Sequence, residues 1–311
     1  MNAAAILLPG QGSQFVGMGL DLAETDGAIR DLYLQADDLL ETKLSRLCWE
    51  GPEEELRATE NAQPAILLHS YAVWRLIGDS CPATVLSGHS LGEFTAHLLA
   101  GTFDFETALG IVRSRGCLMA RAGRKRPGTM QAVMGIDSEE VKDLCAEVTA
   151  SLGGPVVVAA NLNAHNQTAI SGDVEAVEAA GQRAGALGAR VVPLKVSGAF
   201  HSPLMEETRD RFAGVLAGAN IADPEVPVVA NATADPVWDA ATAKDTLVRQ
   251  LTSPVRWTEV LDRMSSGWRP EAWLELGPGK VLAGLARRWD RRVRVRSIGD
   301  ADGIDRFLAA A

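Results

Sequence analysis

Short apolar runs alternate with stretches of helical apolar spacing along most of the chain. Runs typical of buried strands occupy residues 4–8, 84–86, 227–230 and 273–276. Apolar positions at helical spacing fill much of the sequence between them, above all over 26–77 and 105–119, so that one face of each helix would be apolar. Pro64 is expected at the start of one of these helices. Strands and helices in this alternation predict an α/β fold.

The apolar pattern changes in the middle of the chain, where strand-like runs occupy residues 130–136, 155–162, 168–171 and 190–196. Ser138 caps a first helix between these runs and Asp173 opens a second one. The resulting order is strand, helix, strand, strand, helix, strand. This order predicts a ferredoxin-like subdomain over 127–197, inserted into a larger domain made of 1–126 and 198–311.

A strand-to-helix turn with the sequence Gly88-His-Ser-Leu-Gly92 follows the run at 84–86. The two glycines let the backbone turn sharply, which would leave the Ser90 hydroxyl exposed at the tip of a nucleophile elbow. The same turn would direct the N–H of Leu91 toward an oxyanion on an acyl group attached to Ser90. A Gly-rich turn that merely contains a serine is common in α/β proteins, but the strand before it and the amphipathic helix after it favour a nucleophile.

Three further polar residues adjoin predicted elements. Gln11 lies in a Gly-rich loop that lacks the spacing of a phosphate loop, and it either offers N–H groups to a site or forms a plain polar turn. Arg115 falls on the flank of the apolar stripe of 105–119, where a cation needs an internal carboxylate or a bound acid as its partner. His201 follows the last strand of the small subdomain, where it can reach a site or have a structural role.

Composition excludes several classes of function. The 311 residues carry a formal net charge of −10, which argues against broad nucleic-acid binding. Apolar residues make up 47% of the chain, but no apolar run reaches membrane-spanning length, and the first residues lack the basic region of a signal peptide. The four cysteines have no metal-ligand spacing. A cytoplasmic enzyme with reduced thiols and without a metal or cofactor is expected.

Several motifs together resemble those of the bacterial malonyl-CoA:acyl carrier protein transacylases and of the acyltransferases of polyketide synthases. They are Leu8-Pro-Gly-Gln-Gly-Ser-Gln14, Thr59-Glu-Asn-Ala-Gln-Pro64, Gly88-His-Ser-Leu-Gly-Glu93, Arg115-Gly116, Pro127-Gly-Thr-Met130, Phe200-His-Ser202, Gln250-Leu251 and Glu275-Leu-Gly-Pro-Gly-Lys280. The resemblance covers nearly the whole chain. It implies an α/β-hydrolase-like large domain with an inserted ferredoxin-like (βαββαβ) subdomain.

The resemblance also implies roles for single residues. Ser90 would be the nucleophile and His201 its general base. The backbone N–H groups of Gln11 and Leu91 would form the oxyanion hole, and Arg115 would hold the free carboxylate of the acyl group.

Further positions have implied roles around this set. The backbone carbonyl of Gln250 would orient the His201 ring, and Asn161 would lie near the site. The sequence after Asn161 departs from the usual N-S-P-x-Q pattern, and His165 within it is expected in a solvated loop without a catalytic role. Phe200 before the histidine, together with an aliphatic residue after the serine, is typical of malonyl-specific rather than methylmalonyl-specific members.

The implied reaction is a two-step transfer of a malonyl group from coenzyme A to the phosphopantetheine thiol of an acyl carrier protein, through an acyl-serine. The alternative enzyme is an acyl-thioester hydrolase acting on carrier-bound chains, which would have no use for Arg115 in its acyl pocket. An inactive carrier-binding scaffold is a third reading. Fatty-acid and polyketide synthesis both stay open. Basic residues at 121–126 and 287–296 are either docking patches for an acidic carrier or ordinary solvated segments.

Overall fold

The computed structural model describes residues 3–310, which contain a six-stranded and a four-stranded sheet. The larger sheet has the strand order β10-β9-β1-β2-β7-β8. All neighbouring strands in it are parallel except β7 and β8. Its strands are β1 (Ala4–Leu8), β2 (Ala83–Gly88), β7 (Val228–Val229), β8 (Pro236–Val237), β9 (Ala272–Leu276) and β10 (Val295–Ile298). The predicted α/β fold is confirmed.

Helices cover both faces of the larger sheet, because its central strands are apolar on both sides. In β1, Ile6 and Leu8 pack into one core cluster while Ala5 and Leu7 pack into another on the opposite face. The second cluster is closed by α12 (Trp257–Trp268) and α13 (Val281–Trp289). The first is closed by most of the remaining helices: α1 (Leu20–Thr25), α2 (Gly27–Leu40), α3 (Leu44–Glu50), α4 (Glu53–Arg57), α5 (Thr59–Ile77), α6 (Leu91–Leu99), α7 (Phe105–Lys125), α10 (Glu206–Ala217), α11 (Ala240–Arg249) and α14 (Ala301–Leu308).

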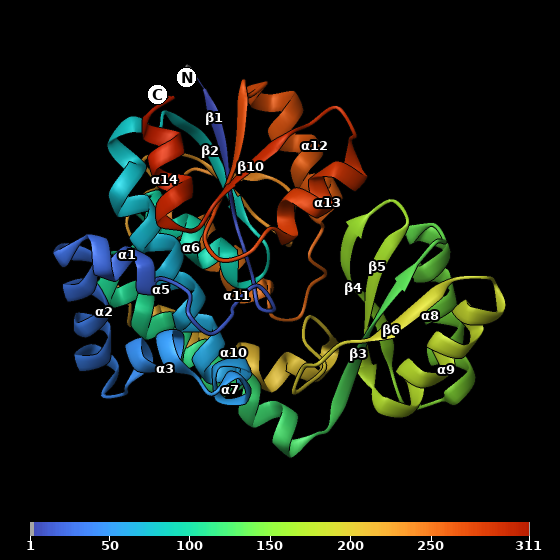
Figure 1. Cartoon of the computed structure of the whole chain (residues 1–311). Helices are drawn as coiled ribbons and strands as arrows, with labels where there is room; N and C mark the ends of the chain where they lie inside the picture. The colour runs from blue at the N-terminus through green and yellow to red at the C-terminus, as the bar shows by residue number, and fades with distance from the viewer. Residues whose placement is uncertain (1–2, 311) are drawn as a thin grey trace.

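The smaller sheet is antiparallel, with the order β4-β5-β3-β6. In chain order its unit consists of β3 (Gly128–Met134), α8 (Ser138–Leu152), β4 (Val157–Ala164), β5 (Gln167–Asp173), α9 (Val174–Ala186) and β6 (Arg190–Pro193). Apolar residues of α8 and α9 share a core cluster with those of β3, β4 and β5. The two helices therefore lie against one face of this sheet, and the unit sits beside the larger one (Figure 1).

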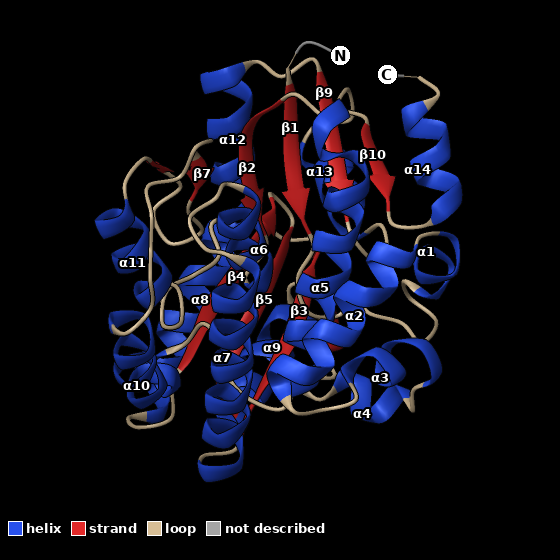
Figure 2. Ribbon diagram, turned by 90° about the vertical axis from the view of Figure 1, so that its left-hand side faces the viewer, coloured by secondary structure: helices blue, strands red, loops and turns tan. Residues whose placement is uncertain are grey.

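Close contacts hold the two units together beyond the carboxyl ends of β1 and β2 (Figure 2). Val255 of the large unit donates its N–H to the carbonyl of Ala160 at 2.8 Å and accepts from the N–H of Leu162 at 2.9 Å. The end of α7 passes against the returning chain so tightly that a Cβ on Gly123 would lie 1.9 Å from the Ser197 carbonyl oxygen. The carboxyl ends of β1 and β2 therefore face the small unit (Figure 2).

Pro64 corrects one expectation, since it lies inside α5 rather than at the start of a helix. Proline has no N–H to give to the carbonyl of Glu60 one turn earlier. The Nη1 atom of Arg113 on α7 donates to that carbonyl and to the side-chain oxygen of Asn61. A neighbouring helix thus satisfies the group that the proline leaves free, and the helix continues.

Two basic segments also differ from expectation. Helical apolar spacing was predicted only over 105–119, but α7 runs through Lys125 because Ala122 and Gly123 continue its inward face. No element was predicted in the basic segment 287–296, yet it contains the end of α13 and the start of edge strand β10, which α14 follows. Arg292 and Arg294 precede this strand and Arg296 lies within it, and these alternating arginines conceal the apolar positions in the sequence. None of the helices within residues 3–310 is long and apolar enough to cross a bilayer.

Candidate active site

Ser90 lies at the tip of the turn between β2 and α6 with a backbone φ of 53°. A left-handed conformation is uncommon for a residue with a side chain and is maintained only where the surroundings impose it. Here they do so by close packing. A Cβ on Gly88 would lie 2.0 Å from the backbone carbon of Gly92, and one on Gly92 would lie 2.0 Å from the carbonyl oxygen of Leu8. The predicted sharp turn is therefore present, and both glycines are required by it.

His201 meets Ser90 from the segment that returns from the small unit. Its Nε2 lies 2.7 Å from the Ser90 Oγ, and its Nδ1 lies 2.9 Å from the backbone carbonyl oxygen of Gln250. Because a carbonyl can only accept, Nδ1 carries the proton and Nε2 is free to accept one from the serine. The His201 backbone is also left-handed, with φ 58°. Burial, together with the positive charge of Arg115, lowers the pKa of His201 from 6.5 to about 3.

Gln11 and Leu91 line the same pocket as Ser90. Gln11 follows β1, and its side chain donates to the Thr59 hydroxyl at 3.1 Å. Leu91 is the first residue of α6, so its N–H has no partner within the helix. Within residues 3–310, neither backbone N–H makes a hydrogen bond. Two free N–H groups and a helix N-terminus thus border the pocket that contains the Ser90 hydroxyl.

Arg115 of α7 is the cation of this pocket, and only 1% of its surface is exposed. Its Nη1 donates to Oε1 of Gln63 at 2.8 Å, and its Nη2 donates to Oε1 of Gln250 at 2.8 Å and to the Ser90 Oγ at 3.2 Å. The guanidinium also lies over the Phe94 ring, 5.1 Å from its centroid.

The charge of Arg115 has no ion-pair partner. Among residues 3–310 no carboxylate forms a salt bridge with it, and its Nε has no hydrogen-bond partner. Burial lowers its pKa from 12.5 to about 9, so the guanidinium stays charged at neutral pH. The sequence allowed two partners for Arg115, an internal carboxylate or a bound acid. No internal carboxylate is in direct contact with the guanidinium, which leaves a bound acid as the direct partner.

Phe200 and Asn161 border the pocket from the side of the small unit. Phe200 is 5% exposed and packs with Met119 and Met130. Asn161, on β4, is 6% exposed and forms a bridge with Val255 of the large unit. Both line the pocket that contains Ser90. Residues from both units therefore enclose the space next to the serine.

Two residues that support the turn, Asn231 and Glu93, were missed by the sequence analysis. Oδ1 of Asn231 accepts from the Ser90 N–H at 2.7 Å, and its Nδ2 donates to the Gly88 carbonyl at 2.8 Å. Glu93 accepts from the Asn231 N–H and from Nε2 of Gln250, which also donates to the Ser90 carbonyl. An acidic residue on the buried face of α6 was a signal for Glu93. The sequence contains no comparable signal for Asn231, because its position next to the turn depends on the neighbouring strand β7.

His89, the residue before Ser90 in the turn, was also missed by the sequence analysis. It is half-buried, its Nε2 lies 2.8 Å from Oδ1 of Asn163 on β4, and its ring meets Trp257 edge-on. It therefore links the turn to the small unit. His165 lies in the exposed turn between β4 and β5, away from Ser90, as expected.

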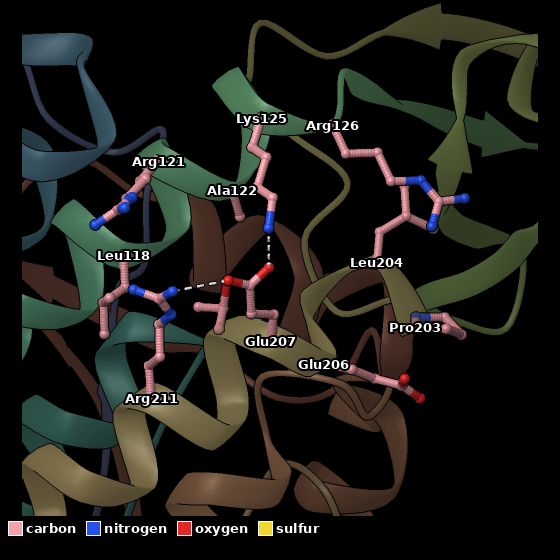
Figure 3. A pocket seen from close by; sticks show the side chains of 11 residues that line it. Leu118, Arg121, Ala122, Lys125, Arg126, Pro203, Leu204, Glu206, Glu207 and Arg211 are labelled. Carbon is pink, nitrogen blue, oxygen red and sulfur yellow. Dashed lines mark hydrogen bonds and ion pairs between the residues drawn. The ribbon is translucent and has the colours of Figure 1, made fainter.

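A second hollow lies on the other side of the returning segment, between α7, α10 and the short helix η2 (Pro203–Met205). Lys125 and Arg211 both point to the carboxylate of Glu207, at 2.5 and 2.9 Å, while Arg126 points away from it (Figure 3). Arg126 pairs with Asp173. Much of the positive charge at the end of α7 is therefore neutralised within the protein.

The site is equipped for covalent acyl transfer. It contains a strained serine, a neutral imidazole in hydrogen-bond contact with its hydroxyl, free N–H groups beside it and a buried cation with no carboxylate in direct contact. Within residues 3–310 no cluster of three or more His, Cys, Asp or Glu side chains could hold a metal ion. The activated serine with a base oriented by a third group is the general arrangement for nucleophilic catalysis.

Comparison with known proteins agrees with this chemistry. The family described as acyl transferase domain matches residues 6–290. The malonyl CoA-acyl carrier protein transacylase of Bacillus subtilis (strain 168) is 42% identical over 307 residues, which cover 98% of this chain and 96% of that protein. The protein of the same name from Escherichia coli (strain K12) is 39% identical over 292 residues, 93% of each chain.

Solved structures give the same result. A malonyl-transacylase in complex with its type II PKS acyl-carrier protein superposes with a TM-score of 0.94 at 37% identity and full coverage of both chains. An acyl carrier protein S-malonyltransferase from Vibrio cholerae has a TM-score of 0.91 at 39% identity, over 97% of this chain and 99% of its own. The chain therefore belongs to the acyl transferase domain family and, within it, to the malonyl CoA-acyl carrier protein transacylases.

Proposed function

We propose that the protein transfers a malonyl group from coenzyme A to the phosphopantetheine thiol of an acyl carrier protein. The observation that carries this proposal is the buried charge of Arg115, which has no carboxylate partner and donates to the Ser90 hydroxyl at 3.2 Å. A malonyl thioester differs from an acetyl thioester by one free carboxylate. A desolvated carboxylate is tolerated only beside a fixed cation, and the guanidinium can bind it through two parallel hydrogen bonds.

In the first half of the reaction, Nε2 of His201 takes the proton of Ser90 while Oγ attacks the thioester carbon. The carbon–sulfur bond breaks, the proton passes from His201 to the departing sulfur, and coenzyme A leaves as a thiol. The N–H groups of Gln11 and Leu91 stabilise the oxyanion that forms on the way. The 2.7 Å contact between Ser90 and His201 supports these roles.

In the second half, the carrier thiol gives its proton to His201 and attacks the malonyl-serine. The carbon–oxygen bond to Ser90 breaks, and Oγ regains the proton from His201. The malonyl group ends as a thioester on the carrier, so one thioester is exchanged for another. The pairing of the malonyl carboxylate with Arg115 offsets the charge that lowers the pKa of His201, which makes the base stronger only when the correct acyl group is bound.

Transfer rather than hydrolysis is supported by the partner of the base. His201 is oriented by the neutral carbonyl of Gln250, where many serine hydrolases place a carboxylate. A carboxylate stabilises the imidazolium that forms when an attacking water is deprotonated. Without it His201 is a weaker base, suited to a thiol, which loses its proton more readily than water does. The acyl-serine is therefore expected to resist hydrolysis until the carrier thiol attacks it.

We also infer the finer architecture. The larger unit is an α/β-hydrolase-like domain made of 1–126 and 198–311, of which residues 1, 2 and 311 lie outside the described part, and 127–197 form a ferredoxin-like subdomain. The strand order β4-β5-β3-β6 with two helices on one face supports the second assignment. Asn161 and Phe200 then belong to the wall of the acyl pocket between the two.

The test is intact-protein mass spectrometry after exposure to an equal mixture of acetyl-, malonyl-, methylmalonyl- and longer acyl-CoA. A malonyl adduct on Ser90 as the main product, discharged by addition of a phosphopantetheinylated carrier protein and stable in its absence, is the expected result. Rapid loss of the adduct in buffer alone would indicate a hydrolase. A preference for acetyl or longer saturated groups would contradict the role of Arg115.

A further inference from the structure

A carboxylate lies buried beneath the nucleophile turn and has no task in the reaction described above. Glu93 stands in the first turn of α6, three residues after Ser90, and is completely inaccessible to solvent. Its Oε2 accepts from the N–H of Asn231 at 3.0 Å and from Nε2 of Gln250 at 2.7 Å. Its Oε1 has no hydrogen-bond partner, and no cation within residues 3–310 forms a salt bridge with it.

The side-chain amide of Gln250 stands between Glu93 and Arg115. Its Oε1 accepts from Arg115 and its Nε2 donates to Glu93, each at close distance. The neighbours fix this orientation, because a guanidinium only donates and an ionised carboxylate only accepts. The amide dipole is therefore aligned between the cation and the anion. The charges of Arg115 and Glu93 are therefore coupled through this amide without direct contact. The same Nε2 also donates to the backbone carbonyl of Ser90.

We propose that Glu93 is a positioning residue for the nucleophile turn and the counter-charge of Arg115 in the empty site, and that it takes up a proton from solvent when the carboxylate of the acyl substrate pairs with Arg115. The inference rests on the proposed function, since it needs an acidic acyl group.

Charge balance in the buried site supports the proposal. The empty site holds one cation, Arg115, and one anion, Glu93. A bound malonyl carboxylate adds a second anion, and an uncompensated buried charge is costly. Protonation of Glu93 restores neutrality and leaves its two accepted hydrogen bonds on Oε2 in place. The unpartnered Oε1 is the oxygen that can take the proton without breaking a contact.

The titration of Glu93 is consistent with this change. Burial raises its pKa from 4.5 to about 7, against the opposing effects of Gln250, Asn231 and Arg115. Removal of the favourable charge of Arg115 by a substrate carboxylate raises the pKa further.

Other titratable groups near Glu93 do not compete for this proton. They are His97 one turn further along α6, His89 before Ser90, and His201. Burial lowers the pKa of all three imidazoles, so they are neutral at the pH where Glu93 titrates. Arg115 is thus the charged side chain whose field acts on Glu93.

The sign of the pH dependence follows from linkage. If the pKa of Glu93 is higher in the complex than in the free protein, binding takes up to about one proton between the two values. The apparent Kd for the malonyl thioester then rises with pH above neutrality, by up to about tenfold per pH unit. An acetyl thioester, which brings no charge to Arg115, shows no such dependence.

Calorimetric titration of malonyl-CoA into the Ser90→Ala protein tests this without acyl transfer. Measurement in two buffers of different ionisation enthalpy gives the number of protons taken up. We expect uptake approaching one proton at mildly alkaline pH with malonyl-CoA and none with acetyl-CoA. Ser90→Ala with Glu93→Gln should bind malonyl-CoA with no uptake and a flat pH profile. The amide oxygen of the glutamine introduced at position 93 can accept both hydrogen bonds in place of Oε2. The NH₂ group of the same amide takes the position of Oε1.

Glu275 provides the matched control. It is a fully buried carboxylate whose pKa burial also raises, but it accepts from the N–H groups of Leu282 and Ala283, and it does not line the Ser90 pocket. Glu275→Gln in the Ser90→Ala background should therefore keep the wild-type proton uptake.

Two negative outcomes are distinguishable. Preferential binding of malonyl-CoA without proton uptake, or with uptake that persists in Glu93→Gln, overturns the inference and leaves the proposed function standing. Equal binding of malonyl- and acetyl-CoA overturns the proposed function itself. If Glu93→Gln does not fold, an infrared difference spectrum of malonyl loading in the unmutated protein decides. A new carbonyl band from a protonated buried carboxyl group, sensitive to D₂O, supports the inference, and its absence refutes it.

Discussion

The His201 ring donates its Nδ1 proton to the backbone carbonyl of Gln250 at 2.9 Å, while the side chain of the same Gln250 accepts from Arg115 at 2.8 Å. One residue at the end of α11 thus orients the base through its main chain and the buried cation through its side chain. The substitution Gln250→Ala should keep the first contact and remove the second. The proposed roles of His201 as base and of Arg115 as acid-binding group can therefore be tested separately.

Ser90→Ala should abolish the acyl adduct and acyl transfer while the protein still folds. The loss can approach the ~10⁶-fold seen when an activated serine is removed. Mass spectrometry of the intact protein and carrier-acylation rates measure it. His201→Ala should slow acylation to a similar extent, because the two act as a unit. An adduct that persists on Ser90→Ala would sink the assignment of the nucleophile.

Arg115→Ala should change which acyl group is loaded. Charge-assisted hydrogen bonds contribute ~1.5–3 kcal/mol each, so loss of two should slow malonyl loading on the order of 10²-fold or more. Acetyl groups should load as well as before or better. Arg115→Lys should recover only part of the malonyl activity, because a point charge does not reproduce the two parallel bonds.

The comparison uses acyl-Ser90 formation from malonyl- and acetyl-CoA at equal concentration. An unchanged ratio of malonyl to acetyl loading in Arg115→Ala would show that the arginine has only a structural role.

Phe200→Ser should raise the rate of methylmalonyl loading relative to malonyl loading. Phe200 is buried at the wall of the Ser90 pocket, where we expect its ring to leave little room for a branch on the acyl group. One methyl group is worth only ~1–3 kcal/mol of discrimination, so the preference of the unmutated protein for malonyl should be clear but incomplete. Equal rates for both thioesters in the unmutated protein contradict this role.

The pH profile of acetyl loading should reveal the effect of Arg115 on His201. Only neutral His201 can take the serine proton, so kcat/KM falls as pH drops through its pKa in the free protein. Burial and Arg115 lower that pKa to about 3, so kcat/KM for acetyl-CoA should stay level well below the ordinary histidine range. In Arg115→Ala the acid limb should move to higher pH. Coincident acid limbs in the two proteins would contradict the electrostatic coupling.

Charge reversal at Arg287 and Arg288 should raise the KM for an acidic carrier protein, and less so at high salt. Both lie at the end of α13, whose Val281 and Leu285 line the Ser90 pocket that the carrier thiol must reach. No salt bridge in the described part of the chain neutralises them.

The matched control is charge reversal at the end of α7. Arg124 and Lys125 are paired with Glu60 and Glu207, so Arg124→Glu with Lys125→Glu should have the smaller effect on the carrier KM. A carrier KM that is unchanged across salt concentrations in both variants shows that neither basic segment is a docking surface.

The local pattern of the chain was sufficient for the elements on which the site is built. The apolar run before Gly88, the two glycines and the amphipathic helix after them predict the turn at Ser90, because the constraint is steric and lies within a few residues. The order of the small unit could be predicted for the same reason, as its strands and helices are neighbours in sequence. Arg115 could be placed on a buried flank by helical periodicity alone.

The tertiary structure alone settled which groups share one buried space. Pro64 is tolerated inside α5 because Arg113, 49 positions along the chain, satisfies the free carbonyl of Glu60. The edge strand β10 forms despite the arginines before and within it because β9 provides the pairing. Glu93 is joined to Asn231 and Gln250 across 138 and 157 residues. Periodicity assigns each side chain to a face, but the balance of charge around Ser90 depends on packing between segments that are remote in sequence.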